Sequence, residues 1–263
     1  MNNHWDNKIY SQFISARTRP AHDLLSVIPK TLNPKVIVDL GCGPGNSTIL
    51  LKERWPNANV MGLDSSSAMI NEAKDKYPQI NFIQEDILKF KPSKKIDLIF
   101  ANASLQWIPN HELLIPQLKG FLEKNGLLAV QMPNNYNAPS HQNIIQVLKT
   151  NPTWEQLLSK LTYGFLTEPL YKANLYYDLF SKAEFENLTI WETTYFQEMP
   201  NHQAIFEWVS GTTLQMVLAE MTKEDKELFS KKYIESILHA YPLQSNNKIL
   251  FPFKRIFMVG SSK

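Results

Sequence analysis

A short run near the start of the chain has the residue types and the spacing that nucleotide chemistry needs. The run VIVDLGCGPGNS occupies positions 36–47: an apolar stretch reaches Asp39, and Gly41, Gly43 and Gly45 follow. Glycine adopts backbone angles that residues with a Cβ rarely adopt, and it lets a ligand lie directly against the main chain. The pattern is typical of a buried strand that leads into a nucleotide-binding turn.

The spacing of this turn distinguishes between ligands. A dinucleotide-binding turn would have a small residue at the position of Asn46, and a phosphate-cradling loop would have a lysine and a serine or threonine after its last glycine. Neither condition is met. Asp39 would repel a pyrophosphate but would attract an ammonium group. We therefore infer a nucleoside-like ligand that carries a positive charge and no phosphate, which S-adenosylmethionine fits.

Two further acids lie at spacings that a repeated strand–helix–strand unit predicts. Asp64 ends an apolar run at 60–64, about twenty residues beyond the glycine turn, where such folds bind ribose hydroxyls. Asp86 follows a strand-like run within 80–87 and could accept a hydrogen bond from the adenine amine, while Ile87 packs on the ring. Taken alone, Asp64 is compatible with a helix N-cap and Asp86 with a solvated loop. Three acids after successive strands favour the ligand-binding interpretation.

The periodicity of the chain predicts the elements that position these residues. Apolar runs at 36–40, 60–64, 80–87, 96–101 and 127–132 read as strands, and helical patterns at 46–55, 67–77 and 113–122 separate them. A helix that opens at Arg19-Pro20 precedes the first strand. Two more strands are expected at 188–195 and 255–259. The fold class predicted is α/β, a doubly wound, Rossmann-like, seven-stranded and mainly parallel sheet.

Beyond Pro133 the pattern becomes mostly helical. Helices are predicted at 141–161, broken at Pro152, and at 203–221 and 223–241. Since 263 residues with 43% hydrophobic content can bury a sizeable core, we expect one domain over residues 1–263. Its N-terminal helices, at 1–30, would lie over the site, and helical insertions at 134–180 and 201–245 would form a cap.

Composition argues against several partners. The net charge of +2, without a lysine or arginine tract, disfavours nucleic acid. No leader and no apolar run of membrane-spanning length is seen, so we expect a cytoplasmic protein without a membrane partner. The single cysteine, Cys42, excludes an intramolecular disulfide and is expected to pack inside the glycine turn. The six histidines show no metal-binding spacing.

The fourth strand leads into NASLQW at 102–107, and this run carries a resemblance. Together with DLGCGPGNS at 39–47 and GLDSS at 62–66, it resembles the trans-aconitate 2-methyltransferase family, one of the class I S-adenosylmethionine-dependent methyltransferases. Stretches at 17–21, 128–133, 199–205 and 241–244 agree, so the resemblance covers nearly the whole chain. It implies the formation of a methyl ester on a small polycarboxylic acid, most simply trans-aconitate, with no obligate protein partner. Because a carboxylate is already ionised at neutral pH, we assign no catalytic base.

These considerations give two sets of candidate site residues. The donor-binding candidates are Asp39, Gly41, Cys42, Gly43, Asn46, Asp64, Ser65, Met69, Asp86, Ile87, Asn102 and Ala103. The acceptor-binding candidates are Arg17, Gln106, Trp107, Gln215 and Arg255. Arginine is favoured because its planar guanidinium matches a carboxylate. Arg255, which opens the last predicted strand, is also compatible with a solvated position, Trp107 is equally compatible with the core, and His141 is expected at the surface.

One departure from the family pattern leaves the acceptor open. Where the family tends to have Leu-Arg-Pro, this chain has Leu214-Gln215-Met216, and the loss of a charge-assisted contact would cost about 1.5–3 kcal/mol. A different or less charged acid is therefore compatible with the sequence. Two alternatives also stay open: a malonyl-acyl-carrier-protein methyl ester synthase, which would need a basic docking face such as Lys94-Lys95, and a non-catalytic protein that binds S-adenosylmethionine.

Overall fold

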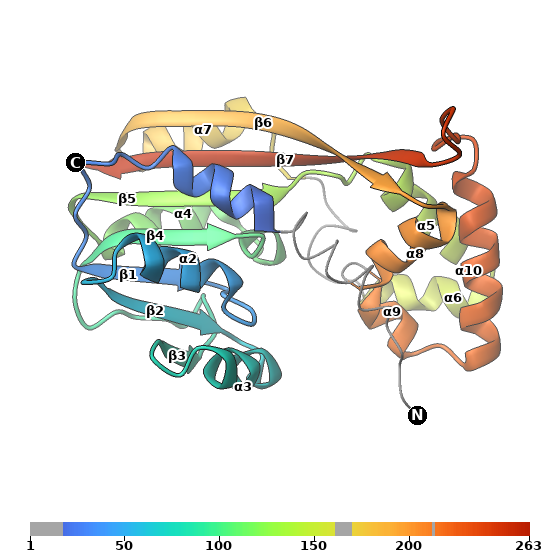
Figure 1. Cartoon of the computed structure of the whole chain (residues 1–263), viewed down its shortest axis with the longest axis horizontal. Helices are drawn as coiled ribbons and strands as arrows, with labels where there is room; N and C mark the ends of the chain where they lie inside the picture. The colour runs from blue at the N-terminus through green and yellow to red at the C-terminus, as the bar shows by residue number, and fades with distance from the viewer. Residues whose placement is uncertain (1–17, 161–169, 212–213) are drawn as a thin grey trace. The chain divides into compact units, whose positions relative to one another are not determined.

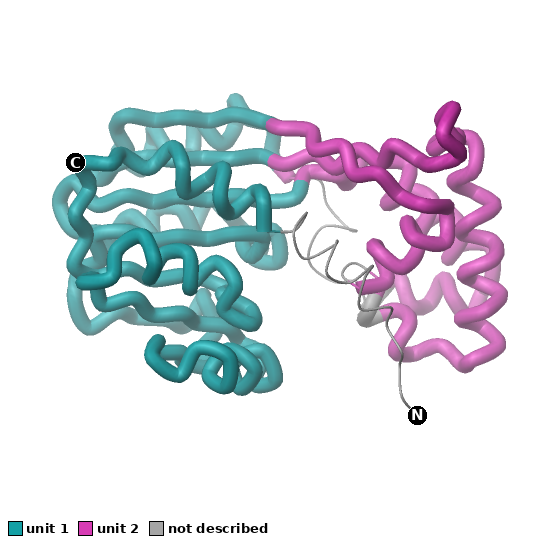
Figure 2. Tube along the Cα trace, viewed as in Figure 1, with its two compact units in different colours: residues 1–133, 171–192, 256–263 teal, residues 134–170, 193–255 magenta. Residues whose placement is uncertain are grey.

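The computed structural model describes residues 18–160, 170–211 and 214–263 (Figure 1). The chain divides into two compact units (Figure 2). Unit 1 consists of residues 1–133, 171–192 and 256–263, and unit 2 of residues 134–170 and 193–255. Unit 2 thus contains most of the predicted insertions at 134–180 and 201–245, whereas residues 171–180 belong to unit 1. Its role as a cap, and the position of residues 1–30 over the site, stay predictions.

A seven-stranded sheet with the order β3-β2-β1-β4-β5-β7-β6 confirms the predicted fold class. The strands are β1 (Val36–Leu40), β2 (Asn59–Asp64), β3 (Asn81–Gln84), β4 (Ile96–Asn102), β5 (Leu122–Pro133), β6 (Phe185–Met199) and β7 (Ile249–Ser262). The first five pair in parallel, and Figure 1 shows β7 running in the opposite direction. The strand order reverses between β1 and β4, and in open α/β sheets ligands bind at the carboxyl ends of the strands beside such a point.

The helices of unit 1 cover both faces of the sheet. They are a helical segment at 18–26, α2 (Asn46–Arg54), α3 (Ser67–Lys76), the short 3-10 helix η1 (Leu105–Trp107), α4 (His111–Phe121) and α7 (Ala173–Lys182). In Figure 1, α2 lies on the near face of the sheet, and α4 and α7 lie on the far face. The central strands are buried on both faces, as expected for a parallel sheet, and Ile37, Leu98 and Val130 have no or almost no exposed surface.

The fifth strand begins earlier than its pattern predicted. Ile96 pairs with Leu122, whereas Leu98 pairs with Leu127, so the register shifts between the two pairs. Asn125 takes a positive φ of 61° within the extra residues. The Asn125-Gly126 dipeptide, predicted as a turn before the strand, therefore forms an irregularity inside β5.

Unit 2 is mainly helical. It contains α5 (Pro139–Leu148), α6 (Pro152–Glu155), the 3-10 helix η2 (Gln156–Lys160), α8 (His202–Ser210), α9 (Gln215–Ala219) and α10 (Lys223–Ile237). Helix α10 packs against α5 and α8. The indole of Trp154 donates to Asp225 Oδ1 at 2.9 Å, and its ring meets Phe229 edge to face. The segment predicted as one helix at 203–221 forms two helices: α8 ends at Ser210, with Gly211 as its C-cap, and α9 begins at Gln215.

His141 shows a further difference from the sequence prediction. The expectation that it lies at the surface is wrong, since only 2% of it is exposed. Its Nδ1 lies 3.0 Å from the Ser140 hydroxyl, and burial lowers the pKa of His141 to about 3. The Ser140 backbone is fixed by two tyrosines: its N–H donates to Tyr241 Oη, and Tyr233 Oη donates to its carbonyl. Burial therefore keeps this histidine neutral at physiological pH.

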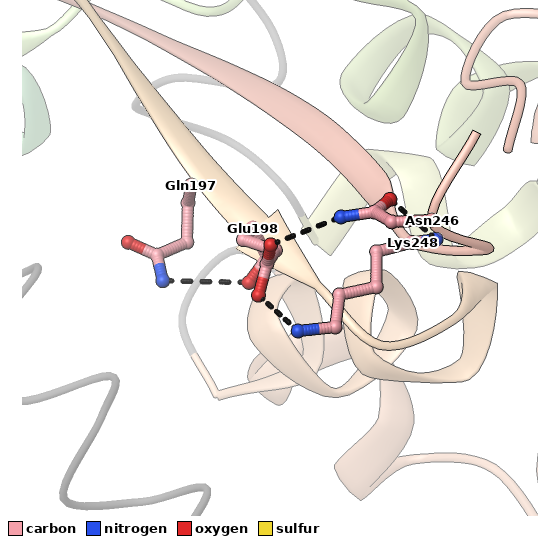
Figure 3. A network of polar contacts seen from close by, with 4 residues as sticks. All are labelled: Gln197, Glu198, Asn246 and Lys248. Atoms are coloured by element: carbon pink, nitrogen blue, oxygen red, sulfur yellow. Dashed lines mark hydrogen bonds and ion pairs between the residues drawn. The ribbon is translucent and has the colours of Figure 1, made fainter. Parts of the chain in front are cut away.

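The ends of β6 and β7 in unit 2 are joined by a polar network (Figure 3). Lys248 Nζ lies 2.5 Å from Glu198 Oε1, and Asn246 Nδ2 donates to Glu198 Oε2 at 3.4 Å. Because these side chains are about half exposed, the pair is expected to add at most about 1 kcal/mol of stability. In the described parts of the chain, no helix combines the length and the apolar character needed to cross a bilayer.

Candidate active site

The glycine turn between β1 and α2 leaves part of its main chain uncovered. Gly41, Gly43 and Gly45 all have positive φ, at 68°, 53° and 85°. A Cβ on Gly41 would lie 2.4 Å from the Cβ of Ser104, so only glycine fits there. A Cβ on Gly43 would meet nothing within 4 Å. The turn is thus closed on the side of Ser104 and open at Gly43, which leaves bare backbone for a ligand.

Asp39 lies beneath this turn and is fully buried. Its Oδ2 accepts hydrogen bonds from Ser47 Oγ and Thr48 Oγ1, both at 2.7 Å, whereas Oδ1 has no hydrogen-bond partner among the described residues. Burial raises the pKa of Asp39 to about 6, although the two hydroxyls oppose the shift. The pairing of Asp39 with a ligand ammonium stays a prediction, and it requires access to the free oxygen.

Asp64, at the end of β2, is tied to the glycine turn. Its Oδ2 accepts from the Gly43 N–H at 3.0 Å, and its Oδ1 accepts from the Ser66 N–H at 2.9 Å. The N-cap of α3 is Ser66 and not Asp64, because the Ser66 hydroxyl accepts from the Met69 N–H. Each carboxylate oxygen keeps a second lone pair, so Asp64 can still receive the two hydroxyls of a ribose. Ser65 and Met69 are exposed nearby in the sequence.

Asp86 and Ile87 follow β3 on the same edge of the sheet. The Glu85 N–H donates to the Asp64 carbonyl at 3.0 Å, which ties this loop to the end of β2. Asp86 is half-buried, and its Oδ1 accepts from the Leu88 N–H at 2.9 Å. Ile87 is buried. The parallel registers of β1, β2 and β3 therefore bring the three predicted acids to the carboxyl ends of neighbouring strands.

The segment Asn102–Trp107, which we call the β4 exit loop, is strained and tightly held. Ala103 has a φ of 54°, in a region that residues other than glycine rarely adopt. Its N–H donates to the Gln131 carbonyl at 2.8 Å, and Gln106 Nε2 donates to its carbonyl at 2.7 Å. Ser104 Oγ donates to the Leu40 carbonyl at 2.6 Å. Trp107 is 38% exposed, which excludes the core interpretation and leaves its ring available as a wall.

Cys42 and Asn46 have structural partners. Cys42 is buried and packs in a cluster with Ile70 and Phe82. Burial raises the pKa of the Cys42 thiol, so the residue packs as expected and is not poised for thiolate chemistry. Asn46 Oδ1 accepts from Lys76 Nζ at 2.9 Å, a contact between α2 and α3.

The residues at these strand ends fit a cationic nucleoside. Besides the three carboxylates, Asn102 Oδ1 and Gln106 Oε1 are buried oxygens without a hydrogen-bond partner among the described residues. Unpartnered buried oxygens are costly, and an ammonium, a sulfonium or hydroxyls would complement them, whereas a phosphate would not. This set of hydrogen-bond acceptors is the one expected around S-adenosylmethionine.

Comparison with known proteins gives the family. Residues 33–184 match a family model described as a methyltransferase domain. A trans-aconitate 2-methyltransferase from Escherichia coli O139:H28 is 45% identical over 256 residues, which cover 97% of either chain. The chain belongs to the trans-aconitate 2-methyltransferase family. A relative of the same name from Shigella flexneri is 44% identical over the same length. The predicted enzyme class, an S-adenosylmethionine-dependent methyltransferase, is confirmed.

Solved structures support the fold. Geranyl diphosphate C-methyltransferase from Streptomyces coelicolor A3(2) matches with a TM-score of 0.58 at 14% identity, covering 100% of this chain and 85% of its own. Phosphoethanolamine N-methyltransferase 2 from Haemonchus contortus, in complex with S-adenosyl-L-methionine, matches with a TM-score of 0.57 at 12% identity, covering 92% of this chain and 52% of its own. At such identities the likeness concerns the fold alone.

The acceptor-side residues of this trans-aconitate 2-methyltransferase family member fall into separate groups. Gln106 and Trp107 lie in unit 1, in the same loop as Asn102 and Ala103. Arg17 lies outside the described residues, as does the side chain of Gln215, whose backbone begins α9 in unit 2. Arg255 also belongs to unit 2.

The sequence pattern predicted that Arg255 begins the last strand, and this prediction is wrong. Strand β7 begins at Ile249, and Arg255 is an interior position with only 5% of its surface exposed. Its guanidinium lies 4.4 Å from the ring centroid of Phe253. A solvated position is therefore excluded, and a contact of Arg255 with the acceptor stays a prediction.

Sequence reasoning missed two residues beside the β4 exit loop. His111 begins α4, and both of its ring nitrogens are engaged: Nδ1 lies 2.8 Å from Tyr176 Oη, and Nε2 lies 2.9 Å from the Leu105 carbonyl. Tyr176 lies on α7, a helix that begins within the helical insertion expected at 134–180 but whose bounds had not been predicted. The spacing of Tyr176 and Phe180, four residues apart, was an available helix signal.

Proposed function

We propose that this enzyme transfers the methyl group of S-adenosylmethionine to a carboxylate oxygen of trans-aconitate. The products are the monomethyl ester and S-adenosylhomocysteine. The observation that carries the proposal is the 45% identity to a trans-aconitate 2-methyltransferase over 97% of both chains. An identity at this level that spans both units includes the segments expected to contact the acceptor as well as the donor.

The donor would be held from the strand ends of unit 1. Asp64 would accept the ribose hydroxyls, Asp86 and Ile87 would contact the adenine, and the open main chain at Gly43 would support the nucleoside. The free oxygen of Asp39 would complement the amino group. When bound, S-adenosylmethionine supplies a methyl group on a positively charged sulfur, and this is the only group that the reaction transfers.

The chemistry asks little of acids and bases. A carboxylate with an ordinary pKa near 4 is ionised at neutral pH, so it loses no proton when it attacks. His111, the histidine next to the β4 exit loop, uses both ring nitrogens in hydrogen bonds and is not free to act as a base. The residues around the acceptor therefore contribute by alignment and by exclusion of water, which can be worth about 7–11 kcal/mol in favourable cases.

The acceptor would be recognised by cations, a polar amide and an apolar wall. Trp107 offers an exposed ring, and Gln106 lies directly beside it in the chain. Arg255, Arg17 and Gln215 complete the expected set. The family's arginine at the Gln215 position is missing, so this chain would hold a tricarboxylate less tightly there than its relatives do.

A second candidate is the methylation of a carboxylate on an acyl carrier protein, although the basic hollow that could receive such a partner lies where β4 and β5 begin, opposite to the strand ends that carry the donor-site residues. A surface hollow of about 680 Å³ in unit 1 is lined by Lys91, Lys94 and Lys95 around Leu88 and Phe121, with no carboxylate in its lining. An acidic carrier protein would match this charge. Lys95 Nζ, however, donates to the Gly120 carbonyl at 2.6 Å, so one of the three cations already serves the fold.

A methyl-transfer assay tests both candidates. The enzyme is incubated with S-adenosylmethionine labelled in the methyl group and, separately, with trans-aconitate, its cis isomer, other tricarboxylates and malonyl-acyl carrier protein. Labelled ester on trans-aconitate supports the proposal, and ester only on the carrier protein supports the alternative. Binding of S-adenosylhomocysteine without transfer to any acceptor would favour a non-catalytic binder and refute both.

A further inference from the structure

We propose that His111 and Tyr176 are positioning residues that fix the β4 exit loop, and with it Trp107, for the acceptor. The inference rests on the proposed function, since it assumes that the acceptor binds beside this loop. Neither residue is expected to touch the reacting atoms. Their effect would pass through the backbone carbonyl of Leu105, the first residue of η1.

The hydrogen bonds define the tautomer of His111. The Leu105 carbonyl can only accept, so the hydrogen of the imidazole lies on Nε2, 2.9 Å from that oxygen. Nδ1 is then an acceptor, and it receives the hydroxyl hydrogen of Tyr176 at 2.8 Å. Both side chains are buried, and burial lowers the pKa of His111, which agrees with a neutral ring. The imidazole thus links α7 to η1 through one donor and one acceptor.

The β4 exit loop is tightly held in its first half, whereas Trp107 at its end depends on the buried side chain of Leu105 and on the link from the Leu105 carbonyl to His111. Trp107 is 38% exposed, so burial of its ring in the core does not anchor it. Ala103 is strained at a φ of 54°, and the hydrogen bond to it from Gln106 comes from within the loop. Ser104 ties the first half of the loop to the Leu40 carbonyl at the end of β1. His111 does the same for the second half, where Leu105 and Trp107 lie.

The rings of Tyr171 and Tyr176 pack beside the imidazole of His111, and its two hydrogen bonds set how the ring is rotated. The ring centroid of Tyr176 lies 5.7 Å from that of His111, and the ring of Tyr171 lies 6.3 Å away in an edge-to-face arrangement. Without the Tyr176 hydroxyl, Nδ1 would become a buried acceptor that lacks this donor. A rotated imidazole would then be favoured, and rotation would also release the Leu105 carbonyl from Nε2.

The test uses Tyr176→Phe, which removes one hydroxyl and keeps the ring. The matched control is Tyr177→Phe, because Tyr177 is the next residue on α7 and is 55% exposed. The full-length protein is labelled with 5-fluorotryptophan, and the resonance of Trp107 is assigned with Trp107→Phe. Of the six tryptophans, the five others serve as internal references. We expect the fluorine resonance of Trp107 to move or broaden in Tyr176→Phe and to stay in place in Tyr177→Phe.

The affinity for S-adenosylhomocysteine and the kcat/KM for trans-aconitate distinguish a positioning role from a general loss of structure. Calorimetric titration with S-adenosylhomocysteine should give the wild-type affinity for Tyr176→Phe, because the donor residues at β1, β2 and β3 are unchanged and the donor candidates Asn102 and Ala103 lie in the first half of the loop, which Ser104 anchors. The kcat/KM for trans-aconitate should fall on the order of tenfold or more, since a misplacement of about 1 Å can cost about 100-fold. His111→Gln keeps an N–H that can reach toward Leu105, so it should retain more kcat/KM than His111→Leu.

The outcomes are distinguishable. A Trp107 resonance that stays in place in Tyr176→Phe overturns the inference, and so does a displaced resonance with wild-type kcat/KM. If the wild-type enzyme forms no ester on trans-aconitate, the proposed function fails, whereas the fluorine spectra still decide whether the pair positions the loop. A Tyr176→Phe protein that loses S-adenosylhomocysteine binding would show a merely structural role.

Discussion

Ionisation of Asp39 should lower the free energy of unfolding of the free enzyme as the pH rises from 4 to 7, and Asp39→Asn should remove this contribution. In the folded protein, burial raises the pKa of Asp39 from 3.8 to about 6. Between these two values the folded state binds more protons than the unfolded state, so stability falls as the pH rises through this window. At about 1.4 kcal/mol for each pH unit, ionisation of Asp39 costs about 3 kcal/mol at pH 7.

The assay compares urea unfolding of wild type and Asp39→Asn from pH 4 to pH 7. All other titrating groups are shared, so they cancel in the difference between the two free energies of unfolding. That difference should change in favour of the variant by about 2 kcal/mol between pH 4 and pH 7, because at pH 4 the unfolded carboxyl is already about half ionised. In addition, Asp39→Asn should lower the free energy of unfolding by about 1–3 kcal/mol at every pH, because the amide nitrogen placed at the free Oδ1 position has no hydrogen-bond partner there. A difference that does not change with pH refutes the reasoning.

The same carboxylate connects stability with donor binding. If the ammonium of S-adenosylhomocysteine pairs with Asp39, binding at pH 6 should convert the half-protonated carboxyl to the ionised form and release about half a proton. Calorimetry in buffers with different ionisation enthalpies measures this release, which should vanish in Asp39→Asn. Binding without proton release would remove Asp39 from the ligand contacts and leave it as a buried support of the glycine turn.

Three other variants test separate parts of the site and fold. Asp64→Ala should weaken S-adenosylhomocysteine binding by about tenfold or more in calorimetry, because contacts to the ribose and to Gly43 are lost. The control variant Asp75→Ala, at an exposed position on α3, should bind with wild-type affinity. Equal affinities of the two variants would exclude Asp64 from the donor site. Gln215→Arg should lower the KM for trans-aconitate by about tenfold in initial-rate measurements if the cation contacts the acceptor, and an unchanged KM would show that it does not. Burial lowers the pKa of His141 from 6.5 to about 3 in the folded protein, so its contribution to the free energy of unfolding should fall by up to about 5 kcal/mol as the pH drops through this window in urea titrations. The same acid sensitivity in His141→Gln would contradict this origin.

The donor half of the site could be predicted from the sequence because its signals are local. Asp39 and Asp64 lie in the last two residues of their strands and Asp86 lies two residues after β3, and parallel pairing then brings the three strand ends together without further information. The role of Gly41 was also readable, although its neighbour Ser104 was not, since that contact joins loops more than sixty residues apart.

The acceptor side could not be predicted to the same degree, because its contacts are distant in sequence. His111 and Tyr176 are 65 residues apart, and only the packing of α4 against α7 brings them together. The burial of Arg255 depends on how far β7 extends before it, and a charged residue close to a predicted strand end gives no sign of that. His141 was misplaced for a similar reason: its neighbour Ser140 is bonded to tyrosines about one hundred residues further along the chain, and the local pattern gives no sign of that packing.

The close approach of Gly41 to Ser104 restricts how this enzyme can diverge. A side chain at position 41 would collide with the backbone-anchored serine, and a larger residue at 104 would press into the first turn. Position 41 is therefore restricted to glycine, and position 104 to residues no larger than serine. Substitutions in the glycine turn and in the β4 exit loop would therefore constrain one another during evolution. New acceptor specificities would arise more easily from residues outside these two segments.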